Sequence, residues 1–339
     1  MKIGVLASNE YYGLDIVARA LIDNINFFQC SIKDIFQYDY IIIHGQPIFQ
    51  WPEEYPPLIF YWVWEFNTLL PMHITNLLSS QVIKILVYNE YCKNQLLQAG
   101  IPKSKIVRVY FDFFKVFPEL RNKTEIDFFK KDRLQYFTFG RLHFRKNIPD
   151  TVKILKQWDK QFKFKIWSGL FPFEKYHQEF ESETLQAIDG DKRFELFVQR
   201  SIPQTEKYEM FKTSWGGVFL SLGEGLGIVP LEALFCGTLS ILNKLPSWIE
   251  LYGEDYPFFV ENIKKVYRHP FHNNFPLYPA YYPVKESVLE RLEKLYSLSE
   301  QEYVEIVKKY QQRLNAHFEN AKYTPEIVVS ALKNTVNNK

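Results

Sequence analysis

The sequence is poor in glycine, in cysteine and in long apolar runs. Only 14 of its 339 residues are glycine, so any cluster of glycines calls for a local explanation. Its three cysteines, Cys30, Cys92 and Cys236, lie far apart and form no C-x-x-C pair, which indicates a reducing compartment and predicts a cytoplasmic location. The apolar runs stop short of the roughly 20 residues that span a bilayer, and the amino terminus lacks a secretory apolar segment. We therefore expect no transmembrane segment, while peripheral contact with a membrane stays open.

The chain also lacks an excess of charge of either sign. It has 41 basic and 39 acidic side chains, which argues against a protein that binds nucleic acid through its overall charge. Hydrophobic residues make up 47% of the chain, as is typical of globular proteins with a sizeable core. A chain of 339 residues with this composition predicts two domains.

Short apolar runs alternate with helical patterns in two separate series. The first third begins with a predicted strand over residues 3–7 and a predicted helix over 14–24, and the second series begins at residue 135. Such alternation is typical of doubly wound parallel sheets. The sequence therefore predicts an α/β protein with an N-terminal Rossmann-like domain over 1–118, a linker over 119–132, a C-terminal Rossmann-like domain over 133–318 and a final helix within 319–339.

The predicted carboxyl ends of the strands locate the candidate site. Ligands of open α/β sheets bind outside these ends, and two such domains in tandem imply a cleft between them. Residues 265–284 are rich in proline and aromatic residues and predict an ordered loop, followed by helices over 285–296, 300–317 and 324–336. Functional residues are therefore expected in the loops that follow predicted strands.

One such loop carries three glycines within five residues. Gly223, Gly225 and Gly227 follow the predicted strand 217–220, and a helix beginning near Pro230 comes next. Glycines let backbone amides approach a ligand closely, and the amides of a helix N-terminus attract phosphate. The loop also carries Glu224, and Glu232 follows early in the helix; carboxylates of this kind bind hydroxyl groups. The alternative is a plain strand-to-helix turn in which Glu232 only favours the helix dipole.

A second loop is basic. Arg141 and Lys146 lie five residues apart after the predicted strand that ends near residue 139, and Arg145 is a competing candidate for the same role. A guanidinium and an ammonium at this place can hold a diphosphate and neutralise the charge that grows as a sugar–phosphate bond breaks. The alternative is a solvated basic loop.

Together the two loops resemble motifs of the retaining GT-B glycosyltransferases, the group that includes glycogen and sucrose synthases and bacterial mannosyltransferases. Gly140-Arg141-Leu142 with Lys146 is similar to that family's G-R-L-x-x-x-K loop, and Glu224 to Glu232 is similar to its E-x7-E motif. The resemblance implies a GT-B fold, in which two Rossmann-like doubly wound domains face each other across a cleft. It also implies that the C-terminal helix, for which 324–336 is the candidate, crosses back to the first domain.

The resemblance also implies roles for individual residues. Arg141 and Lys146 would bind the nucleotide diphosphate, Glu224 the hydroxyl groups of the transferred sugar, and Glu232 the ribose. Further donor contacts would come from Gly140, Gly169, Gly225, Leu226, Gly227 and Ile228. On the acceptor side the candidates are Gly13, Trp64 and Glu65, the last two standing where the family usually has a histidine. Asn147 replaces a glycine that often follows the lysine.

The implied reaction moves a hexose from UDP-hexose or GDP-hexose to an acceptor hydroxyl with retention of configuration. It requires neither a metal nor a further cofactor. The acceptor could be a glycan, a protein or a lipid, and no nucleic acid partner is expected. Two other classes stay open, namely a non-catalytic GT-B protein that binds or stabilises a partner, and a GT-B epimerase or hydrolase of sugar nucleotides.

Two potential metal signals are better explained as loops. Asp189-Gly190-Asp191 has the D-x-D spacing, but it follows a predicted helix end where Asp-Gly favours a turn. His269 and His272 flank Pro270, which breaks the helical face that would align them.

Overall fold

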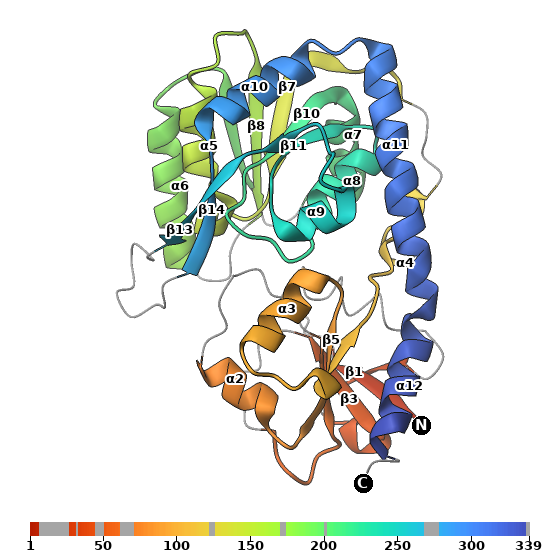
Figure 1. Cartoon of the computed structure of the whole chain (residues 1–339). Coiled ribbons are helices and arrows are strands. Elements are labelled where there is room, and N and C mark those ends of the chain that lie inside the picture. Colours follow the sequence, from red (N-terminus) through yellow and green to blue (C-terminus); the bar gives the residue numbers. More distant parts are fainter. Residues whose placement is uncertain are drawn as a thin grey trace. The chain divides into compact units, whose positions relative to one another are not determined.

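A computed structural model describes residues 1–6, 27–31, 33–44, 51–61, 71–121, 126–169, 174–199, 202–267 and 278–336. The chain divides into two compact units (Figure 1). Unit 1 comprises Met1–Glu119, His269–Tyr278 and Asn315–Lys339, and unit 2 comprises Leu120–Arg268 and Pro279–Leu314.

Unit 1 is built on a parallel sheet with the strand order β2-β1-β3-β4-β5-β6 in its described part. The strands are β1 (Ile3–Leu6), β2 (Phe27–Cys30), β3 (Tyr40–His44), β4 (Leu58–Tyr61), β5 (Val82–Val87) and β6 (Ile106–Arg108). The helices are α2 (Pro71–Leu78), α3 (Glu90–Gln98), α4 (Phe113–Val116) and α12 (Thr324–Val336). The helix predicted over 14–24 lies outside the described residues.

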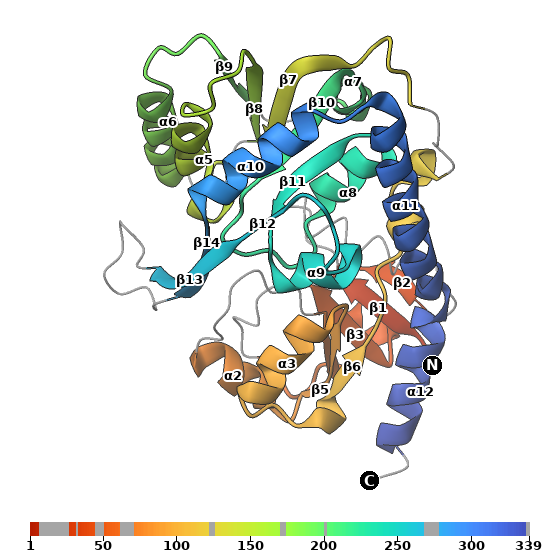
Figure 2. The same cartoon turned by 45° about the horizontal axis from the view of Figure 1, so that its top comes forward.

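Helices cover both faces of this sheet. One face packs Ile41, Phe60 and Val87 with Leu77 of α2 and Leu96 of α3 in a buried apolar core. Figure 2 shows α2 and α3 on one side of β5 and β6, with α12 on the other. Alternate residues of each strand point to opposite faces, so strands covered on both sides read as continuous apolar runs such as YIII in β3.

The C-terminal helix α12 belongs to unit 1. Thr324 at its start exchanges two hydrogen bonds with the backbone of Tyr110: its Oγ1 accepts from the Tyr110 amide at 3.0 Å and donates to the Tyr110 carbonyl at 3.0 Å. Just before it, near the end of α11 (Glu300–Glu319), Phe318 stacks on Phe113 with ring centroids 5.0 Å apart. The side chain of Thr324 and the backbone of Tyr110, 214 residues apart in sequence, thus hold the end of the chain to the first unit.

Unit 2 contains a second parallel sheet, with the order β12-β11-β10-β7-β8-β9. Its strands are β7 (Asp132–Phe139), β8 (Lys163–Gly169), β9 (Phe194–Gln199), β10 (Ser214–Phe219), β11 (Leu239–Asn243) and β12 (Phe259–Val260). Its helices are α5 (Ile148–Leu155), α6 (Glu174–Ile188), α7 (Gln204–Thr213), α8 (Ile228–Phe235), α9 (Pro246–Tyr252), α10 (Lys285–Tyr296) and most of α11. The prediction of two parallel α/β domains is confirmed.

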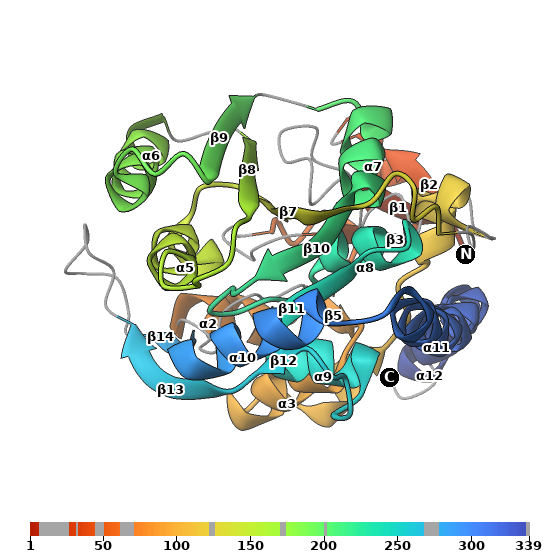
Figure 3. The same ribbon diagram turned by 90° about the horizontal axis from the view of Figure 1, so that it is seen from above.

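Close packing on both faces of β10 explains two of the few glycines. A Cβ on Gly216 would lie 2.6 Å from Cδ2 of Leu295 in α10, and one on Gly217 would lie 2.8 Å from Oγ of Ser240. Figure 3 shows α7 and α8 on one side of β7 and β10 and α5 and α10 on the other. A side chain at Gly216 would therefore press against α10, and one at Gly217 would press against side chains of the sheet itself.

The structure corrects both ends of the predicted loop over 265–284, whose middle part, 268–277, lies outside the described residues. β13 (Asn262–Tyr267) and β14 (Tyr278–Pro283) form a separate two-stranded sheet. Pro279 and Pro283 favour a loop in the sequence. Proline is nevertheless tolerated in edge strands, where the backbone N–H groups on one side do not hydrogen-bond to a neighbouring strand. No helix within the described residues is both long and apolar enough to cross a membrane.

Candidate functional site

The glycine-rich loop connects β10 to α8 and is almost entirely buried. Gly227, the residue before α8, has a φ of 68°, in the left-handed region. A Cβ on Gly227 would lie 2.0 Å from Nε1 of Trp248 in α9. Both the backbone conformation and the close indole require glycine here, and together they fix where α8 begins.

Glu224 of this loop meets two cations of the basic loop that follows β7. Its Oε2 lies 2.7 Å from a terminal nitrogen of Arg145, and its Oε1 lies 2.5 Å from Nζ of Lys146. Ser221 donates a further hydrogen bond to Oε1 at 2.8 Å. The glutamate side chain is 3% exposed, so the carboxylate has exchanged water for these charged and polar partners.

These partners control the ionisation of Glu224. Burial alone would raise the pKa of its carboxyl group, but the positive charges of Arg145 and Lys146, with hydrogen bonds from Lys146 and Ser221, lower the pKa to about 2. Glu224 is therefore a carboxylate at neutral pH and can act only as a hydrogen-bond acceptor.

Backbone hydrogen bonds also join the two loops. Leu222 donates its amide to the carbonyl of Arg145 at 2.8 Å, and the Arg145 guanidinium donates to the carbonyl of Gly223 at 3.0 Å. A short 3-10 turn at Phe144–Lys146 is followed by Asn147, whose φ is 55°. Asparagine is among the few residues other than glycine that adopt this left-handed conformation readily.

The stem of Lys146 runs over Gly140. A Cβ on Gly140 would lie 3.3 Å from Cε of Lys146, so the absent side chain leaves room for the lysine at the end of β7. On the neighbouring strand β8, Ser168 accepts a hydrogen bond from the amide of Leu142 at 3.0 Å. These contacts hold the basic loop against the carboxyl ends of two strands.

The second glutamate of the motif forms a separate ion pair. Glu232 in α8 lies 2.5 Å from Nζ of Lys207 in α7, and both side chains are almost fully buried. Tyr208 Oη lies 3.4 Å from the same carboxylate oxygen, Oε1. The pairing of Lys207 with Glu232 could not be predicted from the sequence, because 25 residues and a whole strand separate the two residues.

The structure thus brings together part of the predicted set. Lys146 and Glu224 are in contact as described above, but the guanidinium beside them comes from Arg145, the competing candidate, while Arg141 is half-buried on the same loop. The other predicted donor residues lie on or next to the two loops and the end of β8, whereas the acceptor-side candidates fall outside the described residues. The first group is Gly140, Gly169, Gly225, Leu226, Gly227 and Ile228, and the second is Gly13, Trp64 and Glu65.

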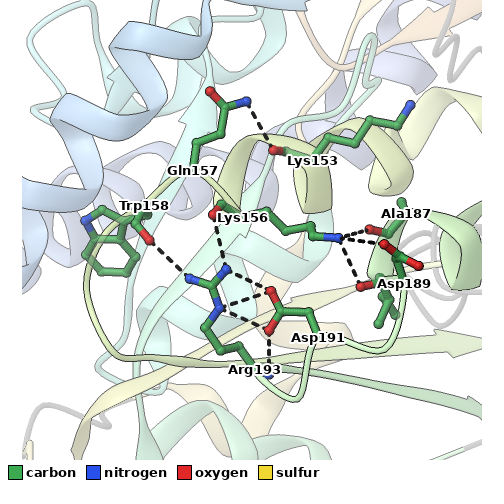
Figure 4. A network of polar contacts seen from close by, with 9 residues as sticks. Lys153, Lys156, Gln157, Trp158, Ala187, Asp189, Asp191 and Arg193 are labelled. Carbon is green, nitrogen blue, oxygen red and sulfur yellow. Dashed lines mark hydrogen bonds and ion pairs between the residues drawn. The ribbon is translucent and has the colours of Figure 1, made fainter.

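The D-x-D segment forms a turn after α6, as predicted (Figure 4). Asp189 and Gly190 both have positive φ, at 50° and 70°. Asp191 accepts hydrogen bonds from Arg193, whose guanidinium also donates to the carbonyls of Lys156 and Trp158. The two aspartates therefore support a turn at the amino end of β9, and His269 and His272 lie outside the described residues.

Comparison with known proteins finds a match in the segment that carries the two loops. A family model described as glycosyl transferases group 1 matches residues 119–262, a segment that contains both loops and both ion pairs. A comparison with curated protein sequences finds no match.

Solved structures match over nearly the whole chain. A trehalose-6-phosphate synthase, OtsA, is 11% identical with a TM-score of 0.68, covering 98% of this chain and 99% of its own. Anabaena Alr3699/HepE, in complex with UDP-glucose, is 15% identical with a TM-score of 0.65, covering 98% and 100%. A glycosyltransferase from Rickettsia africae ESF-5 is 12% identical with a TM-score of 0.61, covering 96% and 83%.

The fold is therefore GT-B, and the resemblance to GT-B glycosyltransferases is confirmed. The second unit is also similar in sequence to the group 1 glycosyltransferases, whose family model matches residues 119–262.

Proposed function

We propose that the protein is a retaining hexosyltransferase that uses a UDP-sugar or GDP-sugar without a metal ion. The observation that carries the proposal is the buried, ionised Glu224 held between Arg145 and Lys146, where the loops after β7 and β10 meet. A carboxylate beside cations at the carboxyl ends of parallel strands suits a ligand that carries both hydroxyl groups and a diphosphate. Since HepE is described in complex with UDP-glucose, a UDP-sugar is the first donor to test.

In this proposal Glu224 accepts hydrogen bonds from the hydroxyl groups of the sugar, and Lys146 binds the diphosphate. Arg141 supplies the second cation by the family resemblance. Arg145 keeps its contacts with Glu224 and with the carbonyl of Gly223, so it holds the two loops together. Lys146 can contact carboxylate and diphosphate at once, because an ammonium has three donors.

The remaining donor contacts follow from the start of α8. Backbone amides from Gly225 to Ile228 bind the sugar and phosphate, and Glu232 binds the ribose. Gly140 and Gly169 keep the ends of β7 and β8 free of side chains near the donor. All of these assignments rest on the resemblance together with the positions of the residues on the two loops.

The proposed chemistry retains configuration at the anomeric carbon. The bond between this carbon and the phosphate oxygen breaks on the same face on which the acceptor oxygen forms its new bond. The departing phosphate takes the proton of the acceptor hydroxyl, so the products are the glycoside and the nucleoside diphosphate. The cations stabilise the charge that develops on the leaving phosphate, which is where electrostatic catalysis is most effective.

The acceptor in this proposal is a hydroxyl of a glycan, a protein or a lipid, bound through the first domain with Gly13, Trp64 and Glu65 as candidate contacts. We also propose a cytoplasmic location, on the basis of the cysteines. Cys92 and Cys236 are both buried, and the three cysteines form no C-x-x-C pair, as is typical of proteins in a reducing compartment.

Product analysis by NMR tests the function. The protein is incubated with UDP-glucose or GDP-mannose and a panel of hydroxyl acceptors, without added metal, and the released nucleotide and the anomeric configuration are measured. Lys146→Met should abolish transfer, whereas Lys153→Met, at an exposed lysine of α5, should leave it unchanged.

Each other outcome identifies a different function. An inverted product would exclude the retaining mechanism. Free hexose or an epimerised donor formed without acceptor would identify a hydrolase or an epimerase. Nucleotide binding without any turnover would identify a non-catalytic GT-B protein.

A further inference from the structure

Lys207 is the lysine of α7 that is buried against Glu232. Its side chain is 8% exposed and that of Glu232 is 2% exposed, and their charged atoms are 2.5 Å apart. By contrast, Lys212 on the same helix is 37% exposed and pairs with Glu209 at the surface. The two lysines therefore allow a matched comparison of a buried and an exposed ion pair on one helix.

Stability alone is a weak explanation for a buried ion pair. Removing two charges from water costs several kcal/mol per ion, and a well-packed apolar pair of similar volume is often as stable or more stable. Glu232 is also one of the two carboxylates to which the proposed function assigns a donor contact. A lysine that neutralises this particular carboxylate therefore points to a role in binding.

The surroundings of Lys207 fix its position. Its ammonium lies 5.5 Å from the ring centroid of Phe139 and 5.4 Å from that of Tyr208, both within cation–π range. Phe139 is the last residue of β7 and precedes Gly140 of the basic loop. Tyr208 in turn is hydrogen-bonded to Gln204, one turn earlier in α7. The ammonium is thus confined between two rings and a carboxylate at the carboxyl end of β7.

We propose that Lys207 is a positioning residue that holds the carboxylate of Glu232 and fixes its orientation, so that Glu232 accepts hydrogen bonds from the two ribose hydroxyls of the donor. The inference rests on the proposed function, from which it takes the ribose contact of Glu232. Because an ammonium only donates and a carboxylate only accepts, the pair leaves Glu232 suited to hydroxyl donors. Lys207 would then set the preference of the site for ribonucleotides.

Calorimetric titration at pH 7 tests this role. The ligands are UDP and GDP, each compared with its 2′,3′-dideoxy form, which lacks both ribose hydroxyls. A hydrogen bond to a charged group changes affinity by about 10- to 100-fold, so wild-type protein should prefer the ribonucleotide by about that factor. Glu232→Gln and Lys207→Met should each reduce this preference at least severalfold, and Lys212→Met should leave it unchanged.

Two further variants separate positioning from direct contact. Lys207→Arg keeps the positive charge and should retain most of the preference. In the double variant Lys207→Met/Glu232→Gln the preference should equal that of Glu232→Gln alone, because Lys207 acts through the carboxylate. If circular dichroism shows that Lys207→Met does not fold, Lys207→Gln replaces it.

The possible failures are distinguishable. Wild-type protein that binds neither nucleotide would overturn the proposed function, and this inference with it. An unchanged ribonucleotide preference in Lys207→Met would overturn the positioning role alone. So would an equal loss of affinity for both forms of the nucleotide, since that result indicates direct contact of Lys207 with the base or phosphate.

Discussion

Replacing Glu224 by glutamine should change how the stability of the protein depends on pH. Its two cationic partners lower the pKa of the wild-type carboxyl group from its ordinary value of 4.5 to about 2. At about 1.4 kcal/mol per pKa unit, this shift corresponds to about 3 kcal/mol of unfolding free energy. Because the folded pKa is the lower one, this contribution is fully present above pH 4.5 and is lost progressively as the pH falls toward 2.

The amide of Glu224→Gln cannot titrate and leaves Arg145 and Lys146 without their anion. We therefore expect the variant to be less stable than wild type by about 3 kcal/mol at pH 7, within the usual range for breaking a buried ion pair. The difference should shrink steadily between pH 5 and pH 3. Urea unfolding followed by tryptophan fluorescence at several pH values measures it, and Trp248 lies next to the glycine-rich loop.

Glu261→Gln is the matched control, since Glu261 is 61% exposed and pairs with Lys244 at the surface. It makes the same chemical change and should alter stability by less than about 1 kcal/mol at every pH. A difference between wild type and Glu224→Gln that stays constant from pH 7 to pH 3 would refute the argument, because it would mean that Glu224 does not titrate with a lowered pKa.

Three further predictions concern the same unit. Gly227→Ala should lower the thermal unfolding midpoint by several degrees, because its Cβ would meet the indole of Trp248; an unchanged midpoint in calorimetry would contradict this. Asn147→Gly should stay within about 1 kcal/mol of wild type in urea unfolding, whereas Asn147→Val should cost more, since a φ of 55° disfavours β-branched residues. Burial lowers the pKa of Lys131 to about 7, an effect that Cys236 partly opposes. The free energy of unfolding of wild type should therefore rise relative to that of Lys131→Met by up to about 1.4 kcal/mol per pH unit from pH 7 to pH 9. Parallel pH profiles of the two proteins would contradict this prediction.

The two loops of the candidate site could be predicted from the sequence because each has a short, continuous sequence pattern directly after a strand. Glycines 223, 225 and 227 follow one strand directly, and the basic residues follow another. The sequence spacing could not show whether Arg141 or Arg145 contacts Glu224. That choice depends on the 3-10 turn and on Asn147, whose left-handed conformation ends the turn. Whether a guanidinium reaches a carboxylate 79 residues away is a matter of tertiary structure.

Other features had even less signal in the sequence. Lys207 stands in a helix whose pattern marks no functional residue, and its pairing with Glu232 depends on how α7 and α8 pack. The strand β14 was missed because its prolines favour a loop, yet Tyr281 in this strand donates its amide to the carbonyl of Leu222. Local sequence patterns therefore predict which loops form the candidate site, and tertiary packing determines which other side chains contact them.

Hydrogen bonds within the protein hold the glycine-rich loop in place. Asn243 donates to the carbonyl of Ser221 at 2.8 Å, and Ser247 donates to the carbonyl of Glu224 at 2.8 Å, so protein groups hold the backbone of the loop in place. The carboxylate of Glu224 likewise holds the ammonium of Lys146, which has already lost much of its water. A diphosphate that binds this ammonium would meet a cation that is already oriented and partly desolvated. Under the proposed function, part of the free energy needed to assemble the site would thus be supplied during folding. More of the interaction energy would then remain for binding the donor and for stabilising the leaving phosphate.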